Sequence, residues 1–479
     1  MKNEYNINSA GNAGIMLEAK ADSESDALSM LKSLATGDKV TASVLDIMGN
    51  EVTINVNNSA IKAALTGNMP VNIGDTITFE VNNDNEKQIV LKPLISGENS
   101  ENLFAQKALD AAMLPVTEKN TEIVMQLVKN NMPVNKEALL EYSRLMAANP
   151  NASPETLVNL KKLEIPITPE NITQFENYKN YEHSISAKIG NISEGFIALS
   201  QNSDGLEALK TMINLPETVS GEDIRTYIGD EQINELKNMV SDETIKESIT
   251  KGITPKELLN VLLNSEKPET LVKSEAFKSV VKMFVREQLL INPAEVSKDN
   301  EIKDFYTRIL KQSGQMTEIL KQSGQENTTA FKEITNVKDN VSFMNDLNHM
   351  LTYVQIPLKF ANQNVHSDLY VFKNKGQKID KDDVSALLHL DMDNLGKMDI
   401  YVKLLNGTNV TTNFCLENEE MLDFINEHMD ILQNRLKELG YNLNATAKIT
   451  GTEHDFVKDF VDEGRIEKEV MRYSFDIRA

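Results

Sequence analysis

Two acidic residues and a glycine, Asp391, Asp393 and Gly396, have the D-x-D-x-x-G spacing that opens a calcium-binding loop. A complete loop of the EF-hand type needs an oxygen ligand at its fifth position and a glutamate at its twelfth. Counted from Asp391, these positions hold Leu395 and Val402. Such a loop also needs a helix on each side, whereas the flanking residues alternate as strands do. We therefore interpret this stretch as a turn between two strands and expect no metal there.

Other residues that could support catalysis are scattered along the chain. The six histidines stand at positions 183, 349, 366, 389, 428 and 454, and none has a cysteine or a second histidine at ligand spacing. His389 and Asp391 share one strand face, but a structural metal site needs three or four ligands. The single cysteine, Cys415, fits a surface or interface thiol better than a nucleophile. Phosphate-binding, hydrolase and zinc-protease motifs are absent. The sequence therefore predicts a non-enzymatic protein without cofactor or metal.

Charge and hydropathy limit the class of partner. The chain has 479 residues and a formal net charge of −23, which disfavours binding to nucleic acid phosphates or to an anionic membrane surface. The first residues lack the basic and apolar segments of a secretory signal, and no apolar run reaches the ~18 residues of a membrane helix. We therefore expect no nucleic acid partner and no membrane insertion.

The N-terminal part is predicted to hold a polar tail followed by a small β domain. Residues 1–30 are rich in Asn, Ser, Gly and Asp and are predicted to be disordered. Residues 31–96 contain two hairpin patterns and a short helical pattern at 58–65, which together predict a small β-barrel or sandwich. Some barrels of this size bind oligonucleotides, but these strands carry few basic or aromatic side chains. We favour a structural or protein-binding role over oligonucleotide binding.

Residues 101–308 are predicted to form helices punctuated by proline. An apolar-Pro-apolar motif followed by Thr or Asn recurs at Leu114, Met132 and Ile165, and each copy reads as the end of one helix and the cap of the next. Thr254 to Glu257 has the form of a complete capping box. These signals predict stacked helical hairpins, an arrangement that suits a scaffold better than a catalytic pocket.

A duplicated heptapeptide suggests a boundary after the helices. The sequence ILKQSGQ begins at Ile309 and again at Ile319, within a stretch rich in Gln, Ser, Asn and Thr. Surface segments tolerate insertions at small energetic cost. We therefore interpret residues 309–345 as a polar linker.

Residues 346–479 have the clearest strand alternation in the chain. Several alternating segments surround the hairpin signal Asn406-Gly407, Pro357 is expected to bend the first of them, and the final residues alternate once more. A single long helix is predicted from an apolar stripe that ends before Gly440: Leu422, Ile425, Met429, Leu432, Leu436 and Leu439. We expect an antiparallel sheet covered by this helix. The fold class of the whole chain is thus α+β and multidomain.

The order of these C-terminal elements resembles a known family. The predicted order is similar to that of the C-terminal domain of the bacterial flagellar hook-length control proteins, in the form common in clostridia. It runs strand, Leu-Gly turn, strand, Asn-Gly turn, strand, long helix and a strand that begins Gly-Tyr-Asn-Leu. Leu395-Gly396 stands at the family's turn, while residues 392–394 are Met-Asp-Asn where the family has Pro-Glu-x. The resemblance covers the region from 346 onward.

The resemblance implies a flagellar function without catalysis. Members act as molecular rulers and, when the hook is complete, switch type III export from rod and hook subunits to filament subunits. The implied partners are the cytoplasmic domain of the export gate and the hook and hook-cap subunits, and the implied location is the cytoplasm with export through the flagellar apparatus. From position alone, we nominate as gate contacts Asp393, Asn394, Leu395, Gly396 and Tyr401. A cytoplasmic helical-repeat adaptor or chaperone of flagellar export is the alternative function.

Overall fold

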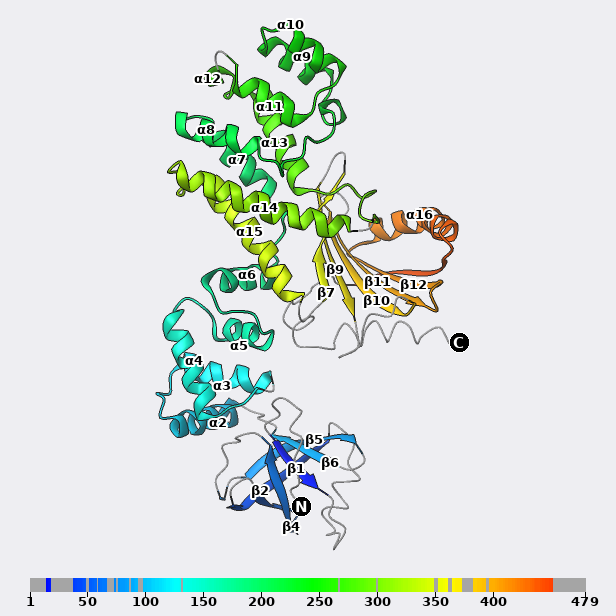
Figure 1. Cartoon of the computed structure of the whole chain (residues 1–479). Coiled ribbons are helices and arrows are strands. Elements are labelled where there is room, and N and C mark those ends of the chain that lie inside the picture. Colours follow the sequence, from blue (N-terminus) through cyan, green and yellow to red (C-terminus); the bar gives the residue numbers. More distant parts are fainter. Residues whose placement is uncertain are drawn as a thin grey trace, which may run out of the picture. The chain divides into compact units, whose positions relative to one another are not determined.

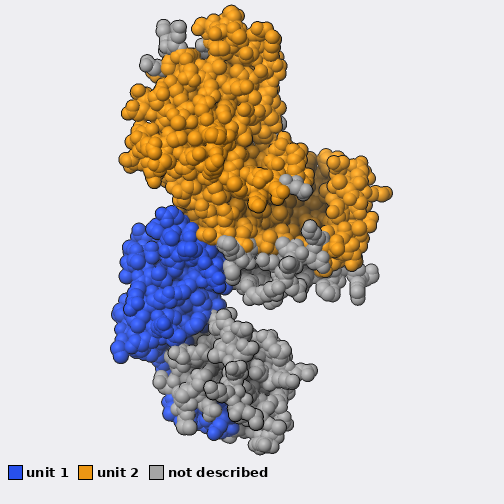
Figure 2. Space-filling view, viewed as in Figure 1, with its two compact units in different colours: residues 1–172 blue, residues 173–479 orange. Residues whose placement is uncertain are grey.

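The computed structural model describes most of the chain. The described residues are 14–18, 38–48, 51–57, 59–66, 73–74, 76–85, 88–93, 98–130, 132–265, 268–298, 300–348, 352–360, 364–372, 382–392 and 396–450. The chain divides into two compact units, residues 1–172 and residues 173–479 (Figure 2). Among the described residues, no helix is both long enough and apolar enough to cross a bilayer.

The first unit begins with antiparallel strands. They are β1 (Gly14–Glu18), β2 (Lys39–Met48), β3 (Glu51–Val56), β4 (Ser59–Thr66), β5 (Thr76–Asn85) and β6 (Gln88–Pro93) (Figure 1). They pair in the order β1-β4-β3-β2-β5-β6, and β6 also pairs with β1. Alternate residues enclose a core: Val40, Ala42, Val44, Val52, Ile54, Val56, Ile61, Ala63, Phe79, Val81 and Leu91. The alternation predicted for β2, β3 and β5 is confirmed.

Two predictions for this region are wrong. Within the tail predicted to be disordered, Gly14–Glu18 forms β1, which pairs with β4 and β6; the rest of residues 1–30 lies outside the described part. The segment predicted to be a short helix is strand β4. Its Ile61 and Ala63 are buried while the intervening Lys62 is exposed, so the two-residue period outweighs the helix propensity of alanine.

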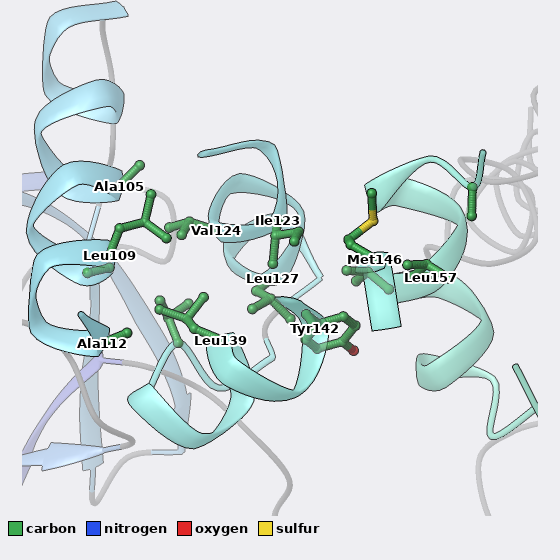
Figure 3. Close-up of a cluster of buried hydrophobic side chains, with 14 residues drawn as sticks. Ala105, Leu109, Ala112, Ile123, Val124, Leu127, Leu139, Tyr142, Met146 and Leu157 are labelled. Carbon is green, nitrogen blue, oxygen red and sulfur yellow. The ribbon is translucent and has the colours of Figure 1, made fainter. Parts of the chain in front are cut away.

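Helices complete the first unit. They are α2 (Glu98–Ala112), α3 (Glu118–Lys129), α4 (Lys136–Ala148) and α5 (Pro154–Lys162). Their buried side chains interlock in one cluster, in which Leu109, Val124, Leu127 and Leu139 face one another (Figure 3). The predicted caps are confirmed: the Thr117 hydroxyl accepts a hydrogen bond from the Asn120 amide.

The second unit starts with a series of short helices. They are α6 (Pro169–Lys179, across the division), α7 (Lys188–Leu199), α8 (Ser203–Ile213), η1 (Ile224–Thr226), α9 (Asp230–Met239), α10 (Glu243–Lys251), α11 (Pro255–Leu263), α12 (Pro268–Leu271) and α13 (Glu275–Leu289). The capping box at α11 is confirmed, because Thr254 and Glu257 each accept a hydrogen bond from the other's backbone amide.

The capping box allows a first stability prediction. Thr254→Ala removes the oxygen that accepts from the Glu257 amide at 3.3 Å, and we expect the free energy of unfolding to fall by about 1 kcal/mol, the usual value of an N-cap. Thr254→Ser keeps this oxygen and serves as the control. Urea unfolding measures both variants; an equal loss in each would contradict the role of the cap.

The predicted linker at 309–345 is wrong, because this stretch forms two long helices, α14 (Glu301–Gln322) and α15 (Thr329–Leu347). Ile309, Met316 and Leu320 are buried on one face of α14. The polar composition is misleading because polar side chains on that face are also buried and bonded: Gln312 donates to Gln288 at 3.1 Å. Helical spacing, rather than composition, decides the structure.

The C-terminal sheet is 7-stranded. Its strands are β7 (Thr352–Gln355), β8 (Leu358–Lys359), β9 (Asn364–Phe372), β10 (Val384–Met392), β11 (Gly396–Leu405), β12 (Asn409–Leu416) and β13 (Asn442–Ile449). The order is β13-β12-β11-β10-β9-β7, with β8 beside β9. The predicted break at Pro357 is confirmed, since it falls between β7 and β8. The sheet is antiparallel except for β12 and β13, which pair in parallel. The prediction of a wholly antiparallel sheet is wrong there, because a helix lies between these strands and carries the chain back.

That helix, α16 (Glu419–Glu438), covers one face of the sheet as predicted. Buried Met398, Phe414, Leu416 and Met421 form the centre of the contact, and the α16 side chains packed against it are Leu422, Ile425 and Met429. The predicted burial is wrong for the last turns, where Leu432 and Leu439 are 36% and 60% exposed. The packed stripe ends at Met429. The alternating residues after 450 lie outside the described part of the chain.

Candidate functional site

The nominated turn joins β10 and β11, which pair from Val384↔Leu404 to Met392↔Gly396. The strands predicted on both sides are confirmed. Asp393, Asn394 and Leu395 lie outside the described residues. Gly396 has φ +78°, a conformation that favours glycine. A Cβ there would lie 2.7 Å from the Glu417 carboxylate, and this carboxylate accepts a hydrogen bond from the Lys397 amide at 3.0 Å.

The nomination of Tyr401 as an exposed contact is wrong. Tyr401 is 7% exposed, and it pairs with Leu387, which is fully buried. The prediction assumed that the polar face of each strand meets solvent. Cys415, predicted to be a surface or interface thiol, is also buried on this face. Both faces of the sheet are therefore buried over much of their area, and a polar residue in the alternation does not mark solvent here.

The face opposite α16 carries paired polar residues. His389 on β10 lies opposite Asp399 on β11, with 2.6 Å between His389 Nδ1 and Asp399 Oδ1. Both side chains are less than a tenth exposed. A buried charge needs a partner of this kind. The partner of His389 is thus Asp399 on the neighbouring strand.

A second buried polar cluster centres on Asp368 of β9, which is fully buried. Asp368 Oδ1 accepts a hydrogen bond from the Tyr353 hydroxyl at 2.5 Å. Asp368 Oδ2 lies 2.9 Å from His366 Nε2 and 3.3 Å from His183 Nε2. The ring of Tyr178 stacks on that of His183, with 4.1 Å between centroids. The carboxylate therefore sits at the centre of a ring of aromatic donors.

Amide groups connect this cluster to the helices. Asn340 of α15 donates to the His183 carbonyl and accepts from the Tyr178 hydroxyl. Gln355 of β7 donates to the Tyr178 hydroxyl at 2.7 Å and to Asn340 at 2.9 Å. Tyr306 of α14 donates to the Gln355 carbonyl at 2.6 Å. We call these residues, together with those around Asp368, the Asp368 cluster: Tyr178, His183, Tyr306, Asn340, Tyr353, Gln355, His366 and Asp368.

Burial and charge set the protonation of the cluster. Burial alone would raise the pKa of Asp368, but the two neighbouring imidazoles hold that pKa well below its usual value. Burial lowers the pKa of His183, and the attraction of Asp368 does not fully offset it. Burial also lowers the pKa of His366, but the attraction of the Asp368 carboxylate is stronger than this effect, so the pKa of His366 is raised. The folded cluster thus favours an ionised carboxylate beside a protonated His366 and a neutral His183.

A third polar contact ties β8 to the helices. Lys359 Nζ lies 3.0 Å from Glu222 Oε1 and 3.1 Å from Glu287 Oε2 of α13. Lys359 and Glu287 are both less than a tenth exposed. The Tyr227 hydroxyl also donates to both carboxylates. The Lys359 hydrogen bond, acting against desolvation, lowers the pKa of Glu222. This contact and the Asp368 cluster therefore both join the sheet to the helices of this unit.

The outer side of α16 is apolar in part. On α16, Phe424 is 41% exposed and Ile431 is 66% exposed. Together with Leu432 and Leu439 we call these residues the α16 surface (helix labelled in Figure 1). Exposed apolar side chains that gather on one element are typical of a protein-binding surface.

Sequence reasoning missed the Asp368 cluster. His183 and Asp368 are separated by 185 positions, so no local spacing connects them. A weaker signal was present in β9, where His366, Asp368 and Tyr370 alternate with apolar or small residues. A charged side chain at the centre of a strand either faces solvent or is buried beside a partner that neutralises it.

Comparison with protein families gave a match in the C-terminal region. Residues 373–454 match the family described as flagellar hook-length control protein FliK. No curated protein and no solved structure matched the chain. The matched range contains β10 to β13 and α16, which are the elements that carried the resemblance in the sequence. Over residues 373–454, the C-terminal region is therefore similar to the flagellar hook-length control family.

Proposed function

We propose that this protein senses completion of the flagellar hook and switches type III export from rod and hook subunits to filament subunits. The observation that carries the proposal is the family match at residues 373–454, which covers one continuous set of strands and α16. The role requires protein contacts and no catalysis. Its partners would be the cytoplasmic domain of the export gate and the hook and hook-cap subunits.

The α16 surface and the turn at 393–396 are the proposed gate contacts. Both lie within the matched range. Ile431 is the most exposed large apolar residue on α16, and apolar anchors that become buried dominate protein interfaces. The Glu417 carboxylate holds the start of β11 beside the turn, so we expect the turn to act together with α16.

This assignment predicts a switching defect for Ile431→Asp. A charge in the centre of an apolar interface costs about 2 kcal/mol or more, so the gate contact should weaken by more than ~10-fold. We expect overlong hooks and few filaments in cells that carry the variant, with hook length measured by electron microscopy. Because Ile431 is exposed, the variant should fold normally, which circular dichroism and thermal unfolding will check.

The matched control is Val116→Asp, which changes another exposed apolar residue, 53% exposed, outside the matched domain. It should leave hook length and filaments unchanged. Normal hooks and filaments in a folded Ile431→Asp strain would overturn the proposed contact. Deletion of the chain from residue 351 is a less specific test. It also removes the sheet residues that bond to Tyr178, Tyr306 and Glu287 of the helical part.

The ordered helices from α2 to α13 favour a second function, a cytoplasmic adaptor or chaperone of flagellar export. These helices have their own apolar cores and several side-chain caps. A hook-length control protein of the ruler type is exported during hook assembly, whereas an adaptor stays in the cell. Detection of the protein in the culture medium during hook growth would favour the ruler. Retention in the cell, with a soluble export client bound to the helices, would favour the adaptor.

A further inference from the structure

The Asp368 cluster contains three side chains that can act as metal ligands. One imidazole nitrogen of His183, one of His366 and a carboxylate oxygen of Asp368 all lie within 4.8 Å of one another. The two nitrogen-to-Oδ2 distances are 2.9 Å and 3.3 Å. With metal–ligand bonds of about 2.0–2.2 Å, neighbouring ligand atoms of a zinc ion lie roughly 3 Å apart. The two distances to the carboxylate therefore match those between ligand atoms of one ion, and the two imidazole nitrogens would have to come to a similar separation from each other.

The ligands are buried and held in place by their neighbours. His183 and Asp368 are each about 1% exposed in their side chains, and His366 is 10% exposed. The Tyr353 hydroxyl fixes the second oxygen of the carboxylate, and the Tyr178 ring stacks on His183. Such outer contacts orient the ligands of natural metal sites. The cluster has this support although it lies outside the family's matched range.

Both imidazoles direct a ring nitrogen at the Asp368 carboxylate. In both His183 and His366, Nε2 faces Asp368, while Nδ1 is buried without a hydrogen-bond partner among the described residues. Two imidazoles and one carboxylate form a donor set that favours Zn²⁺ and similar transition metals over Ca²⁺ or Mg²⁺. Three protein ligands leave a fourth tetrahedral position for water.

We propose that His183, His366 and Asp368 bind one Zn²⁺ ion, which links β9 of the sheet to the segment between α6 and α7. The two histidines come from elements far apart in sequence, so the ion would stabilise their packing. Metal bound only by the folded chain adds its binding free energy to folding. The ion would therefore hold the sheet against the helices of the second unit, with water completing its coordination.

The test measures metal content and affinity on the full-length protein. Protein purified from zinc-supplemented cells should contain one equivalent of zinc by mass spectrometry, and the chelator-treated protein should unfold at a lower temperature. Added Co²⁺ should give the strong visible absorption of a tetrahedral site with nitrogen ligands. Lack of zinc, of Co²⁺ absorption and of any shift in unfolding temperature in the native protein would overturn the proposal without any variant.

Substitutions identify the ligands. His366→Gln should abolish stoichiometric zinc binding, and the matched control His428→Gln, at an exposed histidine of α16, should retain it. Tyr353→Phe keeps all three ligands but removes the hydrogen bond to Asp368, and we expect its zinc affinity to fall by about 10–100-fold. Unchanged binding in His366→Gln, or loss of binding in His428→Gln, would place the metal elsewhere and reject this site.

Discussion

Replacing Asp368 by alanine is expected to lower the free energy of unfolding of the metal-free protein by about 3–5 kcal/mol, the usual cost of removing one partner from a buried charged pair. Asp368 accepts from the Tyr353 hydroxyl and lies beside His366 and His183. The substitution leaves the Tyr353 hydroxyl and the two imidazoles buried without this acceptor. Urea unfolding measures the loss.

The control is Asp430→Ala, which removes an exposed carboxylate in the middle of α16. A surface substitution of this kind changes stability by about 0.5 kcal/mol or less. Both substitutions remove the same atoms. The difference in free energy of unfolding between the two variants therefore measures the effect of the burial of Asp368 and of its hydrogen-bond partners. Similar small losses in both would show that the Asp368 cluster does not stabilise the fold.

The contribution of Asp368 depends on pH with a definite sign. The imidazoles overcome the effect of burial and hold the pKa of Asp368 well below its usual value. Ionised Asp368 therefore stabilises the folded state above the ordinary aspartate pKa of about 3.9, and this contribution is lost as the pH falls through the lowered folded-state pKa. The gap between wild type and Asp368→Ala should narrow in acid.

Much of the C-terminal domain was predictable from the sequence. Apolar alternation placed β10 to β12, and the stripe from Leu422 to Met429 placed α16 on one face of the sheet. The two-residue and 3.6-residue periods are local, so a single sequence carries them. The turn at Gly396 was predictable for the same reason, since strands on both sides excluded a helical calcium loop.

The Asp368 cluster and the burial of Tyr401 were not predictable in this way. Both depend on what covers the second face of the sheet, and some of the covering residues, such as Tyr178 and His183, are far away in the sequence. A polar side chain in a strand is compatible with solvent or with a buried partner, and local pattern does not distinguish them. The linker prediction failed similarly, because buried Gln312 and Ser313 made a core helix resemble a surface segment.

A second large effect is expected for Lys359→Gln, which should lower the free energy of unfolding by about 3–5 kcal/mol. Lys359 Nζ lies 3.1 Å from Glu287, whose side chain is 6% exposed. Without the ammonium group, that carboxylate stays buried with only the Tyr227 hydroxyl as donor among its described contacts. The control is Lys298→Gln, which breaks a solvent-exposed pair with Glu295. Such pairs contribute about 0–1 kcal/mol.

The loss caused by Lys359→Gln should also depend on pH. The hydrogen bond from Lys359 lowers the pKa of Glu222 against the effect of desolvation. This pairing therefore stabilises the folded state above the ordinary glutamate pKa of about 4.3, and its contribution fades as the pH falls through the lowered folded-state pKa. The difference between wild type and variant should thus be largest near neutral pH and smaller in acid.

A double variant separates the loss of the pair from the exposure of an unpaired charge. Removing both partners of a buried ion pair is often nearly neutral, whereas removing one is costly. Lys359→Gln combined with Glu287→Gln should therefore recover a substantial part of the stability that Lys359→Gln alone loses, which gives a favourable coupling in the double-mutant cycle. If the double variant is as unstable as Lys359→Gln, packing of the lysine stem, rather than charge, joins β8 to α13. In that case the sheet would be held to the helices mainly by the Asp368 cluster, and Asp368→Ala should then have the larger effect on stability.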